Sequence, residues 1–182
     1  MSMLGRQWAA WALALGVLWA PLLMASAAGP DISLKDVNGK QRNANEFIGQ
    51  GKWTVVAVWA SDCTICNQEI HHMASFHAAH QDTDATVLGV SIDGHDRKKQ
   101  ALGFVQGHGL IFPNLLAELS QMQKFGGGPI TGTPTYFIYS PEGMLLAAQV
   151  GPITQEHVEK YIAKATLAQA KTGVKKKPHP GG

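Results

Sequence analysis

The only two cysteines of the chain, Cys63 and Cys66, are two residues apart and follow the apolar run 53–60. A thiol that attacks a disulfide needs a second thiol nearby to resolve the mixed disulfide that forms. If the pair opens a helix, one turn brings positions i and i+3 onto the same side. The spacing also suits metal binding, but the buried strand predicted before the pair and Thr133-Pro134 downstream favour redox chemistry.

Cys63 is the candidate attacking thiol because it stands where the helix is expected to begin. The partial positive charge of a helix N-terminus stabilises the reactive thiolate. Asp62 opposes this effect, since a neighbouring negative charge disfavours a second one, and Thr64 and Ile65 supply no compensating cation. We therefore expect a thiol that is only modestly acidified. The alternative role of Asp62 is that of a plain helix N-cap.

Cys66 is the candidate resolving thiol, one turn into the helix. Glu69 follows three residues later, over the same helix face. A partly buried carboxylate there would accept and return the Cys66 proton near neutral pH. The alternative is an exposed glutamate that only interacts favourably with the helix dipole. We expect no cofactor beyond the redox-active Cys63–Cys66 disulfide, and no resident metal.

Histidines near the pair raise the question of a metal site. Four of them fall on the same expected helix: His71, His72, His77 and His80. Cys66 and His72 are about 9 Å apart along a helix axis, and metal–ligand bonds of about 2.0–2.3 Å cannot bridge that separation. We therefore expect a solvated helix face. His95 and His108 are predicted in loops and leave open a copper site of two thiolates and one histidine.

Composition and charge limit the classes of partner. The 182 residues suffice for one globular domain with appendages, with 45% hydrophobic and 15% charged residues. Residues 29–170 hold ten Lys and Arg against thirteen Asp and Glu. A domain of this charge has no basic face to follow a phosphate backbone, so we expect no nucleic acid partner. Residues 171–182 predict a solvated basic tail, or a segment that weakly contacts an acidic surface.

The N-terminal residues 1–28 predict export. Arg6 is the only charge before Asp31, residues 8–24 are mostly apolar, and small residues occupy 25–28. This order is typical of a cleaved signal peptide. An uncleaved membrane anchor is the alternative, because the uncharged stretch is long enough to span a bilayer. Either way the domain is expected in the periplasm, where a disulfide across two residues constrains the chain too little to be structural.

Hydrophobic periodicity and turn signals predict alternating strands and helices. A hairpin is expected around Asn38-Gly39. Strands are expected at 52–60, 86–92, 111–116, 135–139 and 144–150, and helices at 64–80, 95–107, 118–125 and 154–170. Thr154 is the expected N-cap of the last helix. The order predicts an α/β three-layer sandwich with an N-terminal hairpin.

Two motifs give the chain a resemblance to the thioredoxin fold: Trp59-Ala-Ser-Asp-Cys63-Thr-Ile-Cys66 after a buried strand, and Gly132-Thr133-Pro134-Thr135 before another. The N-terminal hairpin, the extra segment 93–125 and Glu69 are similar to the exported TlpA/ResA/DsbE group of thiol–disulfide oxidoreductases. The similarity spans roughly residues 31–167. It implies a thioredoxin-like sandwich with a central insertion, a cis Thr133–Pro134 bond against the cysteines, and a Thr133 backbone that pairs with substrate. Trp59 is expected to pack beside the site and shield it, and Thr133, Pro134 and Trp59 are the expected substrate-binding residues.

The chain departs from the group at three places. Asp62 replaces an aromatic residue, Ile70-His71 stands where many members have proline, and Ala57 replaces the buried acid of cytoplasmic thioredoxins. Glu69 is then the only nearby carboxylate for proton handling.

The resemblance implies an enzyme that reduces disulfides in client proteins, as in cytochrome c biogenesis or copper-site maturation. A membrane electron donor would re-reduce it. The alternative is a copper-binding assembly factor that uses the cysteines as ligands. A peroxidase is a third alternative, and the absence of the Pro-x-x-x-Thr-x-x-Cys context of such enzymes disfavours it.

Overall fold

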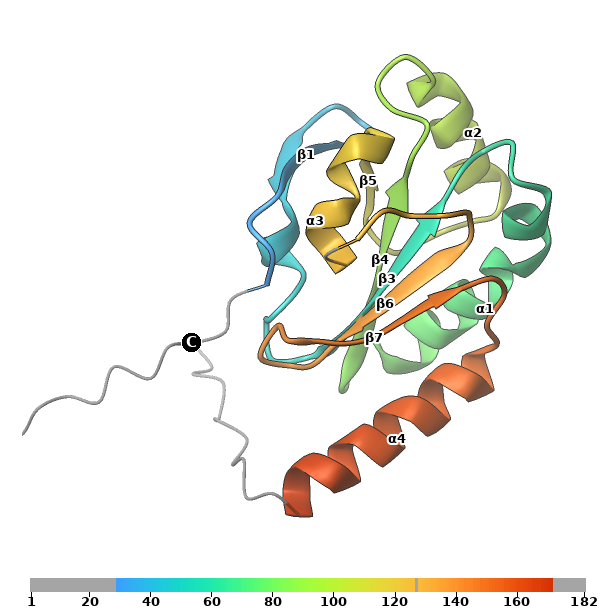
Figure 1. The fold of residues 1–182 in the computed structure, drawn as a ribbon. Helices are drawn as coiled ribbons and strands as arrows, with labels where there is room; N and C mark the ends of the chain where they lie inside the picture. Colours follow the sequence, from blue (N-terminus) through green and yellow to red (C-terminus); the bar gives the residue numbers. More distant parts are fainter. Residues whose placement is uncertain (1–28, 127, 172–182) are drawn as a thin grey trace, which may run out of the picture.

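A computed structural model describes residues 29–126 and 128–171 (Figure 1). The predicted signal peptide or anchor, and the basic tail beyond Lys171, lie outside the described residues. Among the described residues, no helix is both long and apolar enough to cross a membrane.

A seven-stranded mixed sheet forms the middle layer, in the order β2-β1-β5-β4-β3-β6-β7. Its strands are β1 (Ser33–Asp36), β2 (Gln41–Asn43), β3 (Trp53–Trp59), β4 (Ala85–Ser91), β5 (Asn114–Leu116), β6 (Thr135–Tyr139) and β7 (Leu145–Val150). Strands β3, β4 and β5 are parallel, whereas β1, β2, β6 and β7 pair antiparallel with their neighbours. Every residue of β3 is buried, because both faces of the sheet are covered. This burial explains its unbroken apolar sequence.

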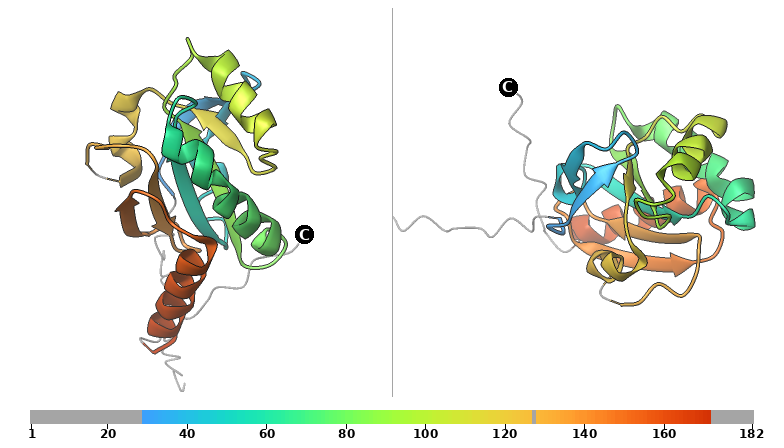
Figure 2. Two further views of the ribbon diagram at one scale, coloured as in Figure 1. Left: turned by 90° about the vertical axis from the view of Figure 1, so that its right-hand side faces the viewer. Right: turned by 90° about the horizontal axis from the view of Figure 1, so that it is seen from above.

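Helices cover the two faces of the sheet (Figures 1 and 2). The first face packs against α1 (Thr64–His80), α2 (Lys98–Gly107) and α4 (Gln155–Lys171). The second face packs against the short elements η1 (Ala44–Glu46) and α3 (Gln123–Gly126), and η2 (Leu119–Gln121), which has no buried residue, precedes α3. Alternate residues of β3 belong to the two cores: Val55, Ala57 and Trp59 to the first, Val56 and Val58 to the second. The predicted three-layer α/β sandwich is confirmed.

Most element boundaries agree with the sequence analysis. Thr154 Oγ1 accepts the backbone N–H of His157 at 3.3 Å, as expected of an N-cap. Helix α2 begins at Lys98 rather than at residue 95. The chain turns before it, with Gly94 at φ +69°, and the side chains of residues 93 and 97 bind residues 61 and 62 in the turn that precedes α1. The helix predicted at 118–125 divides into η2 and α3.

The insertion between β4 and β6 is fastened to the central strands by Asn114. This buried side chain accepts a hydrogen bond from Trp59 Nε1 at 3.2 Å. A Cβ on Gly89 would lie 1.9 Å from Asn114 Oδ1, so only glycine fits opposite it. Strands β4 and β5 therefore lie close together. Their contact places the insertion next to the end of β3, and the cysteines follow that end of the strand.

Candidate active site

Cys63 and Cys66 form a disulfide at the start of α1, with Cα atoms 5.2 Å apart. Cys66 is 1% exposed, whereas Cys63 is only half-buried. Cys63 is itself the N-cap residue, and its Sγ accepts the backbone N–H of Cys66 at 3.0 Å. The alternative role of Asp62 as N-cap is therefore wrong. The backbone N–H of Cys66, together with the helix dipole, would stabilise a thiolate on Cys63.

The Thr133–Pro134 segment lies against the cysteine pair, as the resemblance to the thioredoxin fold implies. Its peptide bond is cis, and the Thr133 carbonyl oxygen is 3.5 Å from Cys63 Sγ. Thr135 Oγ1 donates a hydrogen bond of 2.6 Å to the Gly132 carbonyl, which closes the loop before β6. Thr133 is half-buried, so part of its surface faces solvent beside the accessible sulfur. Its pairing with a substrate backbone stays a prediction.

Trp59 is fully buried at the end of β3, immediately before the site. Its ring stacks on Phe104 of α2 with centroids 4.2 Å apart. The expected packing in the core is confirmed. Because Trp59 has no exposed surface, it cannot contact a substrate in this conformation, so its predicted substrate-binding role is limited to supporting the site.

Glu69 lies one turn beyond Cys66 on α1. Its side chain is 31% exposed, and Oε2 is 3.4 Å from His72 Nε2. This carboxylate is partly buried, as the proton-handling role requires. His72 is a partner that the sequence analysis missed, although its spacing of three residues from Glu69 was a signal. The exchange of a proton with Cys66 stays a prediction.

Arg97 supplies the cation that the residues following Cys63 lack. Its Nη1 donates to Asp62 Oδ2 at 2.8 Å, and Nη2 donates to Ser61 Oγ at 3.1 Å. The hydrogen bond from Arg97 lowers the pKa of the Asp62 carboxyl, and the same bond raises the pKa of Arg97. The negative charge next to Cys63 is therefore partly offset, which corrects our expectation of an uncompensated Asp62.

Buried Asp93 fixes the turn on which Asp62 stands. Its carboxylate accepts hydrogen bonds from the Ser61 N–H at 3.0 Å and from Ser61 Oγ at 2.9 Å. Ser91 Oγ donates a third at 2.7 Å, and Arg97 Nη2 is 3.3 Å away. Sequence reasoning missed this cluster, because its members come together only when the ends of β3 and β4 lie side by side.

A cavity of about 470 Å³ opens between the start of α1 and the exposed side of α2. The Asp62–Arg97 ion pair, further polar side chains and the Phe104 ring line this cavity. The lining residues are Ser61, Asp62, Asn67, Arg97, Gln100, Gly103, Phe104, Gly107 and His108. Asn67 Nδ2 donates to the Cys63 carbonyl at 2.9 Å, and its Oδ1 lies 3.1 Å from His108 Nε2. The lining of this cavity therefore extends through Asn67 to the backbone of Cys63.

The histidines of α1 do not share one environment. His71 is exposed, as predicted. His77 is 5% exposed, its Nδ1 accepts the Val87 N–H at 3.2 Å, and burial lowers its pKa. The prediction of a solvated face is therefore wrong for His77. Within residues 29–126 and 128–171, no three His, Cys, Asp or Glu side chains gather closely enough to hold a metal ion.

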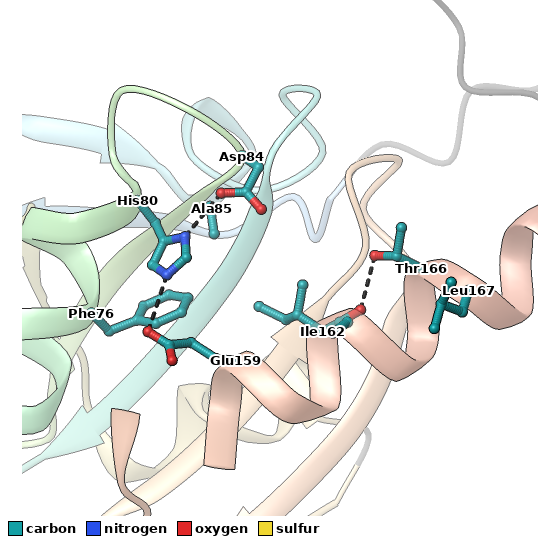
Figure 3. A pocket seen from close by; sticks show the side chains of 9 residues that line it. Phe76, His80, Asp84, Ala85, Glu159, Ile162, Thr166 and Leu167 are labelled. Atoms are coloured by element: carbon teal, nitrogen blue, oxygen red, sulfur yellow. Dashed lines mark hydrogen bonds and ion pairs between the residues drawn. The ribbon is translucent and has the colours of Figure 1, made fainter. Parts of the chain in front are cut away.

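A second cavity, of about 440 Å³, lies at the opposite end of α1 (Figure 3). It is lined by His80 at the end of α1, by Asp84 in the turn before β4, and by Glu159 and Leu167 of α4. A helix of 17 residues is about 25 Å long, so this cavity is remote from the disulfide. It belongs to the α1–α4 packing.

The sheet order, the cysteine pair at a helix start and the adjoining Thr-Pro loop define a thioredoxin-fold protein of the thiol–disulfide oxidoreductase class. The family model described as AhpC/TSA matches residues 25–148, and the chain belongs to that family. It is similar to sporulation thiol-disulfide oxidoreductase A of Bacillus subtilis, with 24% identity over 78% of both chains. It is also 23% identical to ResA of the same organism, over 73% of this chain and 71% of ResA.

Solved structures show the same fold. A thiol:disulfide interchange protein from Chlorobium tepidum has a TM-score of 0.65 and 24% identity, covering 76% of this chain and 94% of that one. A DsbF homologue from Corynebacterium diphtheriae has a TM-score of 0.66 and 20% identity, covering 75% and 85% respectively. The chain is a thiol–disulfide oxidoreductase of the type represented by ResA and sporulation thiol-disulfide oxidoreductase A.

Proposed function

We propose that this protein is an exported reductant of disulfides in client proteins. The observation that carries the proposal is the unequal exposure of the pair. Cys63 is half-buried beside the Thr133 backbone, whereas Cys66 is buried one turn behind it. A client sulfur can therefore reach only Cys63. Export rests on the pattern of residues 1–28.

The reduced pair would act in two displacement steps. The Cys63 thiolate attacks one sulfur of the client disulfide, forms a mixed disulfide, and releases the other client sulfur as a thiolate that takes up a proton. Cys66 then gives its proton to Glu69, and its thiolate attacks Cys63 Sγ. The client's remaining sulfur leaves and is protonated, so the client gains two electrons and two protons. Cys63 and Cys66 end as the disulfide seen here.

The charges around the pair support reduction rather than oxidation. A strong oxidant of this fold has a reduced form that is stabilised, with a potential near about −120 mV. Here Asp62 and Glu69 bring negative charge near the sulfurs, and Arg97 only partly offsets it. Thiolates are therefore less favoured, and we expect a potential below about −200 mV.

The client class follows from the family resemblance. Clients awaiting haem or copper insertion, such as apocytochrome c or copper-site assembly proteins, need reduced cysteines outside the cytoplasm. A membrane electron donor would return two electrons and two protons to the Cys63–Cys66 disulfide after each turnover.

The purified domain 29–171 should reduce insulin and an oxidised apocytochrome c peptide, with stoichiometric loss of its own thiols. The Cys66→Ser variant should trap the peptide as a mixed disulfide on non-reducing gels, whereas Cys63→Ser should trap none. No reduction by wild type, or a potential near about −120 mV, would contradict the proposal. Stoichiometric Cu(I) held by the two cysteines without any reduction would instead favour the copper-binding assembly factor.

A further inference from the structure

Tyr136 carries a polar group that the oxidised structure leaves unused. The residue is 1% exposed, and its hydroxyl has no hydrogen-bond partner among the described residues. Buried hydroxyl groups are normally paired, because an unpaired one loses its bonds to water without compensation. Phenylalanine would fill the same volume without that loss. We therefore ask whether the hydroxyl of Tyr136 has a hydrogen-bond partner in the reduced state of the protein.

The position of Tyr136 places it on the same side of the sheet as the cysteines. It pairs across the sheet with Ala57 of β3, and directly opposite residues have their side chains on the same face. Both belong to the core cluster beneath α1 that contains Cys66. Strand β6 also begins at the Thr-Pro loop, whose Thr133 carbonyl is 3.5 Å from Cys63 Sγ.

When the disulfide is reduced, the core beneath α1 contains a free Cys66 thiol in place of a bonded sulfur. In the oxidised state Cys66 Sγ is bonded to Cys63 and carries no charge. In the reduced state it is a buried thiol that must become a thiolate to resolve the mixed disulfide. A buried charge of this kind is stable only when hydrogen bonds reach it. The Tyr136 hydroxyl lacks an acceptor in the oxidised state, and the Cys66 sulfur needs a donor in the reduced state. The two groups are therefore complementary.

We propose that Tyr136 is a positioning residue whose hydroxyl donates a hydrogen bond to the Cys66 sulfur when the disulfide opens. This inference rests on the proposed function of the pair. The tyrosine donates without losing its proton. Burial and the negative charge of Glu69 raise the pKa of Tyr136 to about 12. The two protons that accompany reduction therefore go to the sulfurs and not to the tyrosine.

The hydrogen bond would stabilise the reduced form relative to the disulfide. Removing it with Tyr136→Phe should favour the disulfide by about tenfold in the equilibrium with reduced and oxidised glutathione. This corresponds to a potential about 30 mV more negative. The variant should also resolve mixed disulfides more slowly. The oxidised variant should be at least as stable as wild type, because its core loses only an unpartnered hydroxyl.

Tyr139→Phe is the matched control, on the same strand but in the opposite core. Its hydroxyl donates to the Phe125 carbonyl, so this variant should lose stability and keep the wild-type potential. An unchanged potential in Tyr136→Phe, or an equal shift in both variants, would overturn the inference. So would a shift that disappears in a Glu69→Gln background, since the tyrosine would then act on Glu69. The glutathione equilibrium is measured whether or not insulin is reduced, so failure of the proposed function remains distinguishable.

Discussion

The two ends of helix α1 use charge in opposite ways. At the N-terminus, Asp62 beside Cys63 is paired with Arg97 from the insertion. At the C-terminus, His80 lies between Asp84 and Glu159, 2.9 and 3.3 Å away (Figure 3). The helix dipole favours anions at the first end and cations at the second. In both places a side chain from a distant segment completes the arrangement.

The difference lies in what the charges surround. At the N-terminus they surround a sulfur that must become an anion, and the pair is exposed, with 65% of Asp62 and 41% of Arg97 accessible. At the C-terminus the charges surround an imidazole, which is 25% exposed and lies between α1 and α4. The charges at the N-terminus of α1 are thus suited to tuning the reactivity of Cys63. Those at the C-terminus are suited to stabilising the packing of α4 on α1. Substitutions at each end should separate these two consequences.

The largest effect should come from Cys63→Ser. Insulin reduction should fall more than about 1,000-fold, because a hydroxyl does not replace the thiolate and the buried Cys66 cannot take its place. His80→Gln, at the other end of α1, should keep the wild-type rate within about twofold. Turnover of both variants is measured with the same electron donor. A tenfold loss in His80→Gln would show that the two ends are not separate.

Glu69→Gln should slow resolution of the mixed disulfide by about 100-fold, the lower range for loss of a general base. The glutamine keeps the size of the side chain but cannot take the Cys66 proton. Formation of the mixed disulfide through Cys63 should be nearly unchanged. Stopped-flow kinetics with a fluorescent disulfide peptide separate the two steps. His72→Gln, which alters only the neighbour of Glu69, is the control and should have a smaller effect.

Local patterns in the sequence were sufficient for the fold and for the position of the cysteine pair at the start of a helix. The apolar run ending at Trp59, the cysteine pair after it and the Thr133-Pro134 dipeptide are read from adjacent residues. The structure places them together as expected. Burial of His77 was also readable, because it continues the stripe of Cys66, Ile70 and Met73 at helical spacing.

The partners of the site could not be predicted in the same way. Arg97 is 35 residues from Asp62, and their contact depends on where α2 begins, which the periodicity placed three residues too early. The unpartnered hydroxyl of Tyr136 depends on which side chains surround it in the core. Such facts arise from tertiary packing, and a pattern along one segment does not encode them.

Arg97→Gln should reduce the reactivity of Cys63 about two- to fivefold, the range expected for loss of an exposed ion pair. The uncompensated Asp62 charge would then disfavour the thiolate. Iodoacetamide alkylation across pH measures this change. Asp62→Asn should act in the opposite direction, and Lys98→Gln, which removes a neighbouring charge of the same sign, is the control. If Lys98→Gln has the same effect, total charge rather than the Asp62–Arg97 pair is responsible.

The smallest effect should come from His80→Gln, as a pH-dependent change in stability. Burial of the imidazole opposes its charging, but hydrogen bonds with Asp84 and Glu159 outweigh burial and raise the pKa of His80. The raised pKa means that the stabilisation is complete below the unfolded value of about 6.5 and is lost as pH rises through the folded value. The Tm difference between wild type and variant should be about 1–3 °C at pH 5.5 and should vanish by pH 9.

The Tm of wild type must be compared with that of His80→Gln at each pH, because His77 also contributes to the pH dependence of stability. Burial lowers the pKa of His77, so its contribution to stability is present above the unfolded value and lost as pH falls through the folded one. The two histidines therefore act in opposite directions on the pH profile of the wild type. Only subtraction of the His80→Gln profile isolates the C-terminal end of α1. A Tm difference that is constant from pH 5.5 to 9 would show that His80 acts by packing on Phe76, whose ring centroid is 4.6 Å from the imidazole, rather than by charge.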